Sequence, residues 1–254
     1  MRTRDRRSAT RFLGLLSPVI GWFLVAGVPL WMLLGSTRLL MTEAYLHFEY
    51  TRPYFPADPY GFTQDERQEY ARYAVDYLQG DHDITYLAEL TLPDGRAMYN
   101  PRELRHMADV KTVTQIALTI HNALTVILAG AIVWLSRQPG TRRLLRKSLA
   151  CGGYLTIGLI LALVIIITLN WDLFFDGFHQ LFFESGTWRF EYSDTLIRLF
   201  PERFWFDAAM AIGLLTVTGE ALLIGAAWLW GRQTKAAASH DTAAAESEPE
   251  SEPE

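Results

Sequence analysis

The sequence predicts an all-α membrane protein with four transmembrane helices and a small extracytoplasmic α/β insertion between helices 1 and 2. Of its 254 residues 50% are hydrophobic, and four long windows are almost free of charge. Each window holds roughly 20 residues or more, enough to cross a hydrocarbon layer of about 30 Å. Because lipid offers the backbone no hydrogen-bond partners, each window is expected to be a helix. A soluble fold would have to bury four helices of unusual length and apolarity.

The basic residues predict how these helices are oriented. Arginines cluster before the first window, in "RTRDRRSATR", and between the second and third, in "SRQPGTRRLLRK", whereas the two longer connections are mixed or acidic. By the positive-inside rule, both termini and the middle loop are then cytoplasmic. The expected segments are a basic N-terminus (1–11), helix 1 (12–40), an extracytoplasmic segment (41–109), helix 2 (110–135), a basic cytoplasmic loop (136–148), helix 3 (149–170), an extracytoplasmic loop (171–207), helix 4 (208–230) and an acidic cytoplasmic tail (231–254).

The extracytoplasmic segment 41–109 accounts for the predicted insertion. Its stretch "DERQEYARYAVDYLQG" has tyrosine, alanine and leucine on one stripe and charges opposite, which predicts an amphipathic helix. The stretch "ITYLAELTLPDGRAMYN" has a Pro-Asp-Gly turn between two short runs, which predicts a β-hairpin. The tail 231–254 is acidic and of low complexity, so we expect it to be disordered.

Two ionisable side chains are predicted deep in the membrane, where such groups are costly and should pair. At about 1.5 Å per residue, His121 in helix 2 and Glu220 in helix 4 both fall near the midplane. We expect a polar pair in which His121 or Asn122 meets Glu220. A polar staple between helices is favoured over a proton or ion path, because helices 1 and 3 carry no internal charge to continue a relay.

Two further histidines are predicted at the outer membrane surface. His106 lies three residues from both Glu103 and Asp109, so a helix entering the second span would place it between two carboxylates. A carboxylate beside an imidazole can fix its tautomer and stabilise its cation. His179 follows the third span and would share one helical face with phenylalanines at i, i+3, i+4 and i+7, namely Phe175, Phe178, His179 and Phe182. An interfacial histidine that snorkels to water remains an alternative for His179.

Several familiar chemistries are absent from the sequence. It has no G-x-S-x-G nucleophile elbow, no H-E-x-x-H zinc helix and no G-x-x-x-x-G-K-[ST] phosphate loop. Its only cysteine, Cys151, excludes an intramolecular disulfide or a paired-cysteine metal site. A divalent metal on Glu103, His106, His179 and Asp194 is conceivable, but nothing in their spacing demands it. We therefore expect no metal and no cofactor.

Two blocks of the sequence together resemble a known family. The first is "YNPRELRHMADVK" before helix 2, and the second is "FDGFHQLFFESGTWRFEYSDTLIRLFPERFWFD" before helix 4. With four spans in the same order over roughly residues 12–230, the sequence resembles the lipoprotein intramolecular transacylases (Lit) and their integral-membrane relatives. The positions that carry this resemblance are Glu103, His106, Asp109, Val110, Phe178, His179, Trp188, Asp194, Leu196, Ile197 and Pro201.

The resemblance implies a reaction and a set of site residues. Such enzymes move the sn-2 acyl chain of a diacylglyceryl lipoprotein to the α-amino group of its N-terminal cysteine, which yields a lyso-form lipoprotein. The family's two essential histidines would correspond to His106 and His179, which makes 171–207 a catalytic loop. Supporting roles would fall to Glu103, Asp109, Trp188 and Asp194, and acyl-chain contacts at the interface to Phe175, Phe178, Phe182 and Phe183.

Histidine acid–base chemistry suits this reaction. A neutral imidazole can take the proton as the amine attacks the ester, and the resulting cation or a second imidazole can protonate the leaving glycerol oxygen. We assign the base to His179 and the polarising or protonating role to His106. The implied location is the bacterial cytoplasmic membrane with the active site on the outer face. The expected partners are a diacylated lipoprotein and membrane lipids, and no nucleic acid.

Two alternatives stay open at this point. A membrane phospholipid acyl hydrolase or transferase could use the same two histidines, because the residues do not distinguish one ester from the other. A non-catalytic membrane assembly or transport protein would instead make the level of His121 and Glu220 the functional one.

Overall fold

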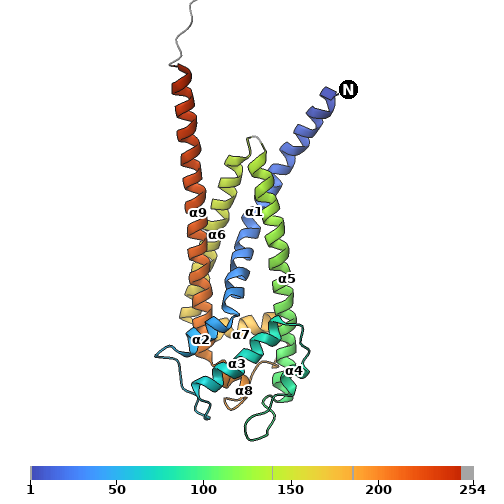
Figure 1. Ribbon diagram of the computed structural model, residues 1–254, viewed down its shortest axis with the longest axis vertical. Coiled ribbons are helices and arrows are strands. Elements are labelled where there is room, and N and C mark those ends of the chain that lie inside the picture. The colour runs from blue at the N-terminus through green and yellow to red at the C-terminus, as the bar shows by residue number, and fades with distance from the viewer. Residues whose placement is uncertain (1, 139, 185, 247–254) are drawn as a thin grey trace, which may run out of the picture. The chain divides into compact units, whose positions relative to one another are not determined.

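The computed structural model describes residues 2–138, 140–184 and 186–246, with side chains described between residues 16 and 233. The described chain is built from helices and short connections (Figure 1). In chain order the helices are α1 (Arg2–Leu40), α2 (Glu43–Tyr50), α3 (Gln64–Gln79), α4 (Thr85–Ala88), α5 (Pro101–Arg137), α6 (Arg142–Leu169), α7 (Trp171–Phe182), α8 (Thr195–Leu199) and α9 (Glu202–Glu246).

Four of these helices are long and apolar enough to cross a membrane, as the sequence predicts. The candidate spans are Leu16–Leu40, Pro101–Arg137, Arg142–Leu169 and Glu202–Gln233. Most residues in the most apolar part of each span are not buried by protein, so their apolar side chains need lipid around them. The chain is therefore a multi-pass membrane protein.

The chain divides into two compact units. The first unit comprises Met1–Pro29, Val126–Ile157 and Val217–Glu254. Its helices approach one another at glycines: a Cβ on Gly152 of α6 would lie 3.3 Å from the backbone oxygen of Val25 in α1, and one on Gly153 would lie 2.8 Å from the side chain of Ile224 in α9. Such small residues let helices pack closely in lipid, where dispersion contacts replace the hydrophobic effect as the cohesive force.

The second unit comprises Leu30–Thr125 and Gly158–Thr216, and it contains the helices α2, α3, α4, α7 and α8. Its core is rich in aromatic residues, and α3 contacts α2, α4 and α8 around it. Tyr50 of α2 donates from its hydroxyl to the carbonyl of Leu199 in α8 at 2.8 Å. The expected amphipathic helix is confirmed as α3, whose Ala71, Ala74 and Tyr77 are buried in this core.

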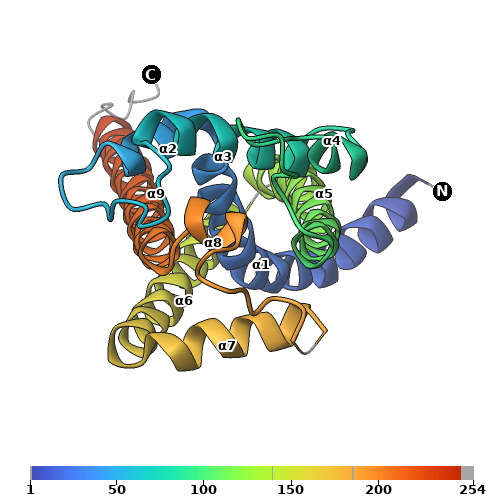
Figure 2. The same cartoon turned by 90° about the horizontal axis from the view of Figure 1, so that it is seen from below.

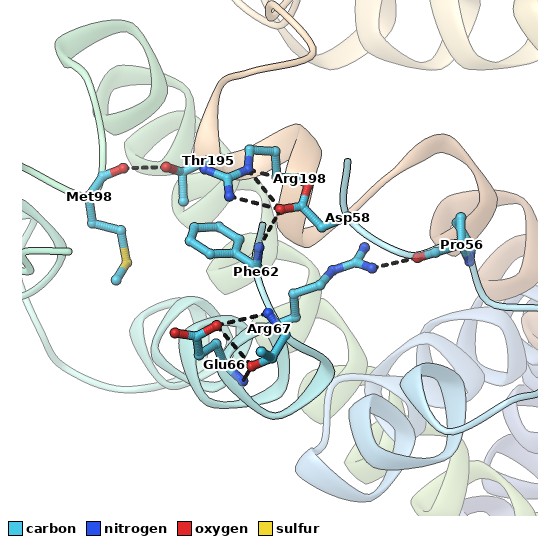
Figure 3. A network of polar contacts seen from close by, with 9 residues as sticks. Pro56, Asp58, Phe62, Glu66, Arg67, Met98, Thr195 and Arg198 are labelled. Carbon is cyan, nitrogen blue, oxygen red and sulfur yellow. Dashed lines mark hydrogen bonds and ion pairs between the residues drawn. The ribbon is translucent and has the colours of Figure 1, made fainter. Parts of the chain in front are cut away.

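A buried ion pair holds the loop between α2 and α3. Arg198 of α8 donates from Nη2 to Oδ2 of Asp58 at 2.8 Å, and these side chains are only 10% and 0% exposed. The Phe62 N–H donates to the same carboxylate at 2.8 Å, and Arg67 donates nearby to the carbonyl of Pro56 (Figure 3). Burial alone would raise the pKa of Asp58, but the hydrogen bonds from Arg198 and Phe62 lower it. We call Asp58, Phe62 and Arg198 the Asp58 network.

The predicted α/β character of the insertion is wrong. The described residues contain no β-strand, and the expected hairpin is reduced to one bridge between Thr91 and Ala97 around a turn at Gly95, whose φ is 84°. The first run forms the helical turn α4 instead, and the carboxylate of Asp83 accepts the Thr85 N–H at 2.9 Å. The runs that remain beside the turn are too short for a ladder to extend.

The C-terminal helix is longer than the sequence analysis predicts. Helix 4 was expected to end at residue 230 and a disordered tail to follow, but α9 continues through Glu246. The run "KAAASHDTAAAE" is rich in alanine, the residue with the highest helix propensity, which accounts for the extension. The last part of the expected tail, 247–254, lies outside the described residues.

Candidate active site

His179 lies on α7. This helix runs crosswise to the end of α6 (Figures 1 and 2). The helix starts where the side chain of Asn170 accepts the Leu173 N–H at 2.9 Å. The stretch is thus helical, which is the condition under which the sequence analysis places His179 on one face with the phenylalanines. Part of its apolar surface is not covered by protein: Leu173 and Leu181 are 65% and 75% exposed. An amphipathic helix with an uncovered apolar face is typical of a membrane surface.

His179 is half-buried, and its tautomer follows from one hydrogen bond. Its Nδ1 lies 2.7 Å from the carbonyl oxygen of Phe175, one turn earlier in α7. A carbonyl can only accept, so Nδ1 carries the hydrogen and the neutral ring has its lone pair on Nε2. Burial lowers the pKa of His179, although the Phe175 carbonyl and the charge of Asp176 oppose this. Burial therefore favours the neutral ring, whose lone pair is on Nε2.

His106 is buried on the first turns of α5 and lacks a hydrogen-bond partner at Nδ1. The residue is 8% exposed, and no described group bonds this nitrogen. Its ring lies 6.1 Å from that of His179, with the two planes inclined by 24°. Phe183 and Phe190 meet it edge-on at 5.1 and 5.3 Å. The two histidines that the sequence singles out thus lie together within an aromatic enclosure.

Trp188 completes the group of rings. Its ring lies 4.8 Å from that of His179, and the residue is 7% exposed. Its Nε1 is buried and has no hydrogen-bond partner among the described residues. We call His106, His179 and Trp188 the histidine cluster. Buried polar atoms in folded proteins are nearly always paired, so two open nitrogens in one cluster mark a place where a substrate could supply the partners.

The carboxylates expected beside His106 do not bond it. Glu103 is 1% exposed and accepts two backbone N–H groups, from Asn100 at 2.7 Å and from Leu196 at 2.7 Å. Its side chain thus joins the start of α5 to the start of α8, one turn away from the imidazole. Asp109 is half-buried and forms no described hydrogen bond with His106. The tautomer of His106 is therefore not fixed by a carboxylate, in contrast to the expectation.

Asp194 contacts residues that hold the aromatic rings around His106, and it forms no described hydrogen bond with a histidine. It accepts from Asn100 Nδ2 at 3.0 Å and from Arg102 Nη2 at 2.7 Å. Arg102 in turn lies over the ring of Phe190, 5.4 Å from its centroid, and Phe190 contacts His106. Asp194 thereby ties the loop that carries Phe190 to the first turn of α5.

The phenylalanines predicted to contact acyl chains fall into two pairs. The rings of Phe175 and Phe183 lie 4.1 and 5.6 Å from that of His179, inside the enclosure. Phe178 and Phe182 are more exposed, at 45% and 44%, and their rings lie 5.0 Å apart; the ring of Phe178 also lies 5.6 Å from that of His179. The first pair shapes the site, and the second offers an apolar surface beside it.

Sequence reasoning missed Asn100, Arg102 and Phe190. Asn100 accepts the Glu103 N–H at 3.0 Å, while the Asn100 N–H donates to Glu103 at 2.7 Å, so the two form a capping box. The pattern "NPRE", with Asn before Pro and Glu three positions later, is a readable signal for this helix start. Phe190 carries no such signal, because its role depends only on which ring it meets.

The two intramembrane polar groups lie in different units. In the first unit, Glu220 is fully buried, and its Oε1 lies 2.9 Å from Oγ1 of Thr156. In the second unit, His121 meets the ring of Trp31 edge-on at 5.9 Å, and Asn122 accepts from Arg38 at 2.8 Å. The pairing of His121 or Asn122 with Glu220 stays a prediction. Among the described residues, no group of three or more His, Cys, Asp or Glu side chains is arranged to hold a metal.

Comparisons with known proteins point in one direction. Residues 22–205 match the family model of the lipoprotein intramolecular transacylase Lit. A protein of Aquifex aeolicus (strain VF5), described as uncharacterized, is 30% identical over 182 residues, which cover 71% of this chain and 80% of that protein. The membrane-integral Lit of Bacillus cereus has a similar structure, with a TM-score of 0.75 at 23% identity over 87% of this chain and 99% of that one. A structure of the same protein with a histidine-to-arginine mutation gives a TM-score of 0.71 at 23% identity, over 91% and 99% of the two chains.

Proposed function

Because the chain belongs to the lipoprotein intramolecular transacylase family and is thus an acyltransferase, we propose that it acts by acid–base catalysis at His106 and His179. In this proposal the sn-2 acyl chain of a diacylglyceryl lipoprotein moves to the α-amino group of the same molecule's N-terminal cysteine. The product is a lyso-form lipoprotein with an N-acyl chain. The substrate would be reached from the outer leaflet, where the topology inferred from the basic residues locates the histidine cluster.

The observation that carries the proposal is the convergence of two imidazoles from distant parts of the chain. Their ring centroids lie 6.1 Å apart, each ring is packed by phenylalanine, and His106 has an open nitrogen. Amine and ester belong to one substrate molecule, so an enclosure that holds that molecule folded supplies the proximity that the reaction needs. No nucleophilic side chain is required for such a transfer.

His179 is suited to be the base. Its neutral form offers Nε2, since Nδ1 donates to the carbonyl of Phe175. Nε2 would take a proton from the amine as the amine nitrogen attacks the sn-2 carbonyl carbon. The imidazolium would then return this proton to the glycerol oxygen as the carbon–oxygen bond breaks. The proton count closes without any other acid or base.

His106 is suited to polarise the leaving group. Its open Nδ1 can donate a hydrogen bond to the glycerol oxygen and stabilise the negative charge that grows there. Two imidazolium ions at this separation, in an apolar enclosure, would repel each other strongly. We therefore favour a mechanism in which His179 alone carries the proton over one in which both histidines are charged.

The test is the substitution His179→Ala in the purified enzyme with a diacylated lipopeptide in detergent. We expect N-acyl transfer, followed by mass spectrometry of the N-terminal cysteine, to fall by about 10²–10⁴-fold. His82→Ala is the matched control, because His82 is exposed and its one ring contact within the described residues is with Tyr86. Retention of full transfer by the His179 variant would refute the scheme. Release of fatty acid from phospholipid by the wild type, without N-acylation, would favour the phospholipid hydrolase instead.

A further inference from the structure

We propose that Trp188 is a third catalytic residue, whose indole N–H donates a hydrogen bond to the carbonyl oxygen of the acyl group in transfer. This inference rests on the proposed function, because it assigns an additional group to the same reaction. Three observations on the position of the indole support it, and a chemical argument separates its role from that of His106.

The first observation is an unused donor in a buried place. Trp188 is 7% exposed, and its Nε1 has no hydrogen-bond partner among the described residues. A buried indole N–H normally finds an acceptor, because leaving it unpaired is unfavourable. By contrast, the indole N–H of Trp31 in the same unit donates to the hydroxyl of Thr125 at 2.8 Å. The open N–H of Trp188 is therefore a feature that an incoming oxygen atom can satisfy.

The second observation is its distance from the base. The ring centroids of Trp188 and His179 lie 4.8 Å apart, with the planes inclined by 34°. His179 also neighbours His106, whereas no ring contact joins His106 and Trp188 within the described chain. His179, the proposed base, thus lies between two rings that each carry a nitrogen without a hydrogen-bond partner, His106 with Nδ1 and Trp188 with Nε1. An ester beside His179 could meet both of them with its two different oxygens.

The third observation is that the backbone and neighbours hold this indole in place. Residues 186–188 form a turn in which Gly186 has a φ of 87°, and Thr187 donates to the carbonyl of Glu184 through its backbone N–H and its hydroxyl. The guanidinium of Arg189 lies 5.1 Å from the centre of the indole ring. A hollow of about 310 Å³ opens beside Trp188 and is also lined by Gln180, Gly186 and Arg189. The indole is thus positioned from several sides at the edge of an open space.

The chemistry of the two open nitrogens assigns them to different oxygens. An indole N–H donates and never accepts, and it keeps its proton throughout. It therefore suits the carbonyl oxygen, which becomes an oxyanion when the amine adds and must not be protonated for the intermediate to collapse. Imidazole can donate or accept, so His106 suits the glycerol oxygen, which gains a proton at the end of the reaction.

The step balances with these assignments. The amine nitrogen forms a bond to the sn-2 carbonyl carbon, the carbonyl π pair moves to oxygen, and Trp188 donates to that oxyanion. His179 Nε2 takes one proton from the nitrogen. When the carbonyl re-forms, the bond from carbon to the glycerol oxygen breaks, and that oxygen takes the proton from the His179 imidazolium.

The experiment replaces the N–H while keeping the ring. Substitution of Trp188 by benzothienylalanine exchanges N–H for sulfur in a ring of almost the same shape, and Trp188→Phe removes the N–H by ordinary mutagenesis. In the full-length enzyme with a diacylated lipopeptide, we expect kcat to fall by about 10²-fold in both variants while KM changes little. If Trp188 served only to pack the site, Trp188→Phe would lower the thermal unfolding temperature, and the benzothienyl variant would keep its kcat.

Two controls keep the outcomes separate. Benzothienylalanine at Trp205, which packs on Phe200 and Phe204 and has no ring contact with His106 or His179 among the described residues, should leave kcat unchanged. His179→Ala reports on the proposed function itself. If His179→Ala is inactive and the benzothienyl variant keeps its kcat, the role of Trp188 is wrong and the histidine scheme stands. If His179→Ala is active, the histidine scheme fails, whatever Trp188 does.

Discussion

Two of the regions in which the second unit buries polar side chains are satisfied to very different degrees. In the Asp58 network, the carboxylate accepts from both Arg198 and the backbone of Phe62, and the ion pair is almost wholly excluded from solvent. In the histidine cluster, by contrast, Nδ1 of His106 and Nε1 of Trp188 have no partner among the described residues. Both regions are packed by aromatic rings, so burial alone does not distinguish them.

The difference teaches which region serves the fold and which serves the reaction. A fully paired network is rigid, and removing one partner leaves a buried charge without compensation. A buried donor without a partner destabilises the fold and persists only where the surrounding packing holds it. The first kind of region should fail by unfolding, and the second by loss of turnover in a folded protein. The predictions below test this distinction, beginning with the largest effect.

The substitution Arg198→Met should be the most damaging to stability. It leaves Asp58 buried without its cation, which we expect to lower the free energy of unfolding by about 3–5 kcal/mol. Thermal and denaturant unfolding in detergent micelles measure the loss. The matched control is Asp94→Asn, which breaks the exposed pair with Arg96 and should leave stability unchanged. Normal stability of the Arg198 variant, with transfer lost, would reverse the roles of the two regions.

Glu103→Gln should lower stability less. The amide keeps one acceptor oxygen and turns an N–H₂ group toward a backbone N–H, so we expect a cost of about 1–3 kcal/mol. Glu89→Gln, at an exposed position, is the control. The comparison is sharpened by the pH profile of transfer. If the pH profile is unchanged, Glu103 serves the fold. If it shifts, Glu103 interacts with His106, as the sequence analysis expects.

Thr156→Val should have a smaller effect in the first unit. It removes the hydroxyl beside Glu220 while keeping the shape, and hydrogen bonds between membrane helices are worth roughly 0.5–2 kcal/mol. We expect a modest drop in unfolding temperature and unchanged N-acyl transfer, with Ser17→Ala in the same unit as a second polar deletion for comparison. Loss of transfer as complete as in His179→Ala would make the Glu220 level functional and support a proton path.

Asp176→Asn should produce the smallest change, a shift in pH dependence. Transfer needs neutral His179, so the rate should fall at acidic pH as His179 is protonated, at a pH below the usual histidine pKa of about 6.5. The charge of Asp176 raises the pKa of His179, and removing that charge lowers it further. The acidic limb of kcat should therefore move to lower pH. Asp172→Asn on the exposed side of α7 should not move it, and a shift to higher pH in Asp176→Asn would contradict the role of His179 as base.

Most of the membrane architecture could be predicted from composition and periodicity. Four apolar windows correspond to four long helices, whereas the helix α7 was only a condition for the shared face of Phe175, Phe178 and His179. The failures have local causes. The hairpin gave way to α4 because its strands were too short, and the tail after Trp230 became helix because alanine favours it. Secondary structure is predicted correctly where one short-range preference dominates, and less well where two preferences compete.

The sequence by itself determined the spans and their expected orientation, because hydropathy and charge are properties of neighbours along the chain. Its resemblance to the transacylase family singled out His106 and His179 as the catalytic pair. Only the tertiary structure decided that Glu103 bonds the backbone of α8 rather than His106, and that Trp188 lies against His179 with its N–H open. Those facts depend on side-chain directions and on contacts between separate elements. Spacing fixes which residues share a helix face, but it does not say which distant atom a side chain on that face will meet.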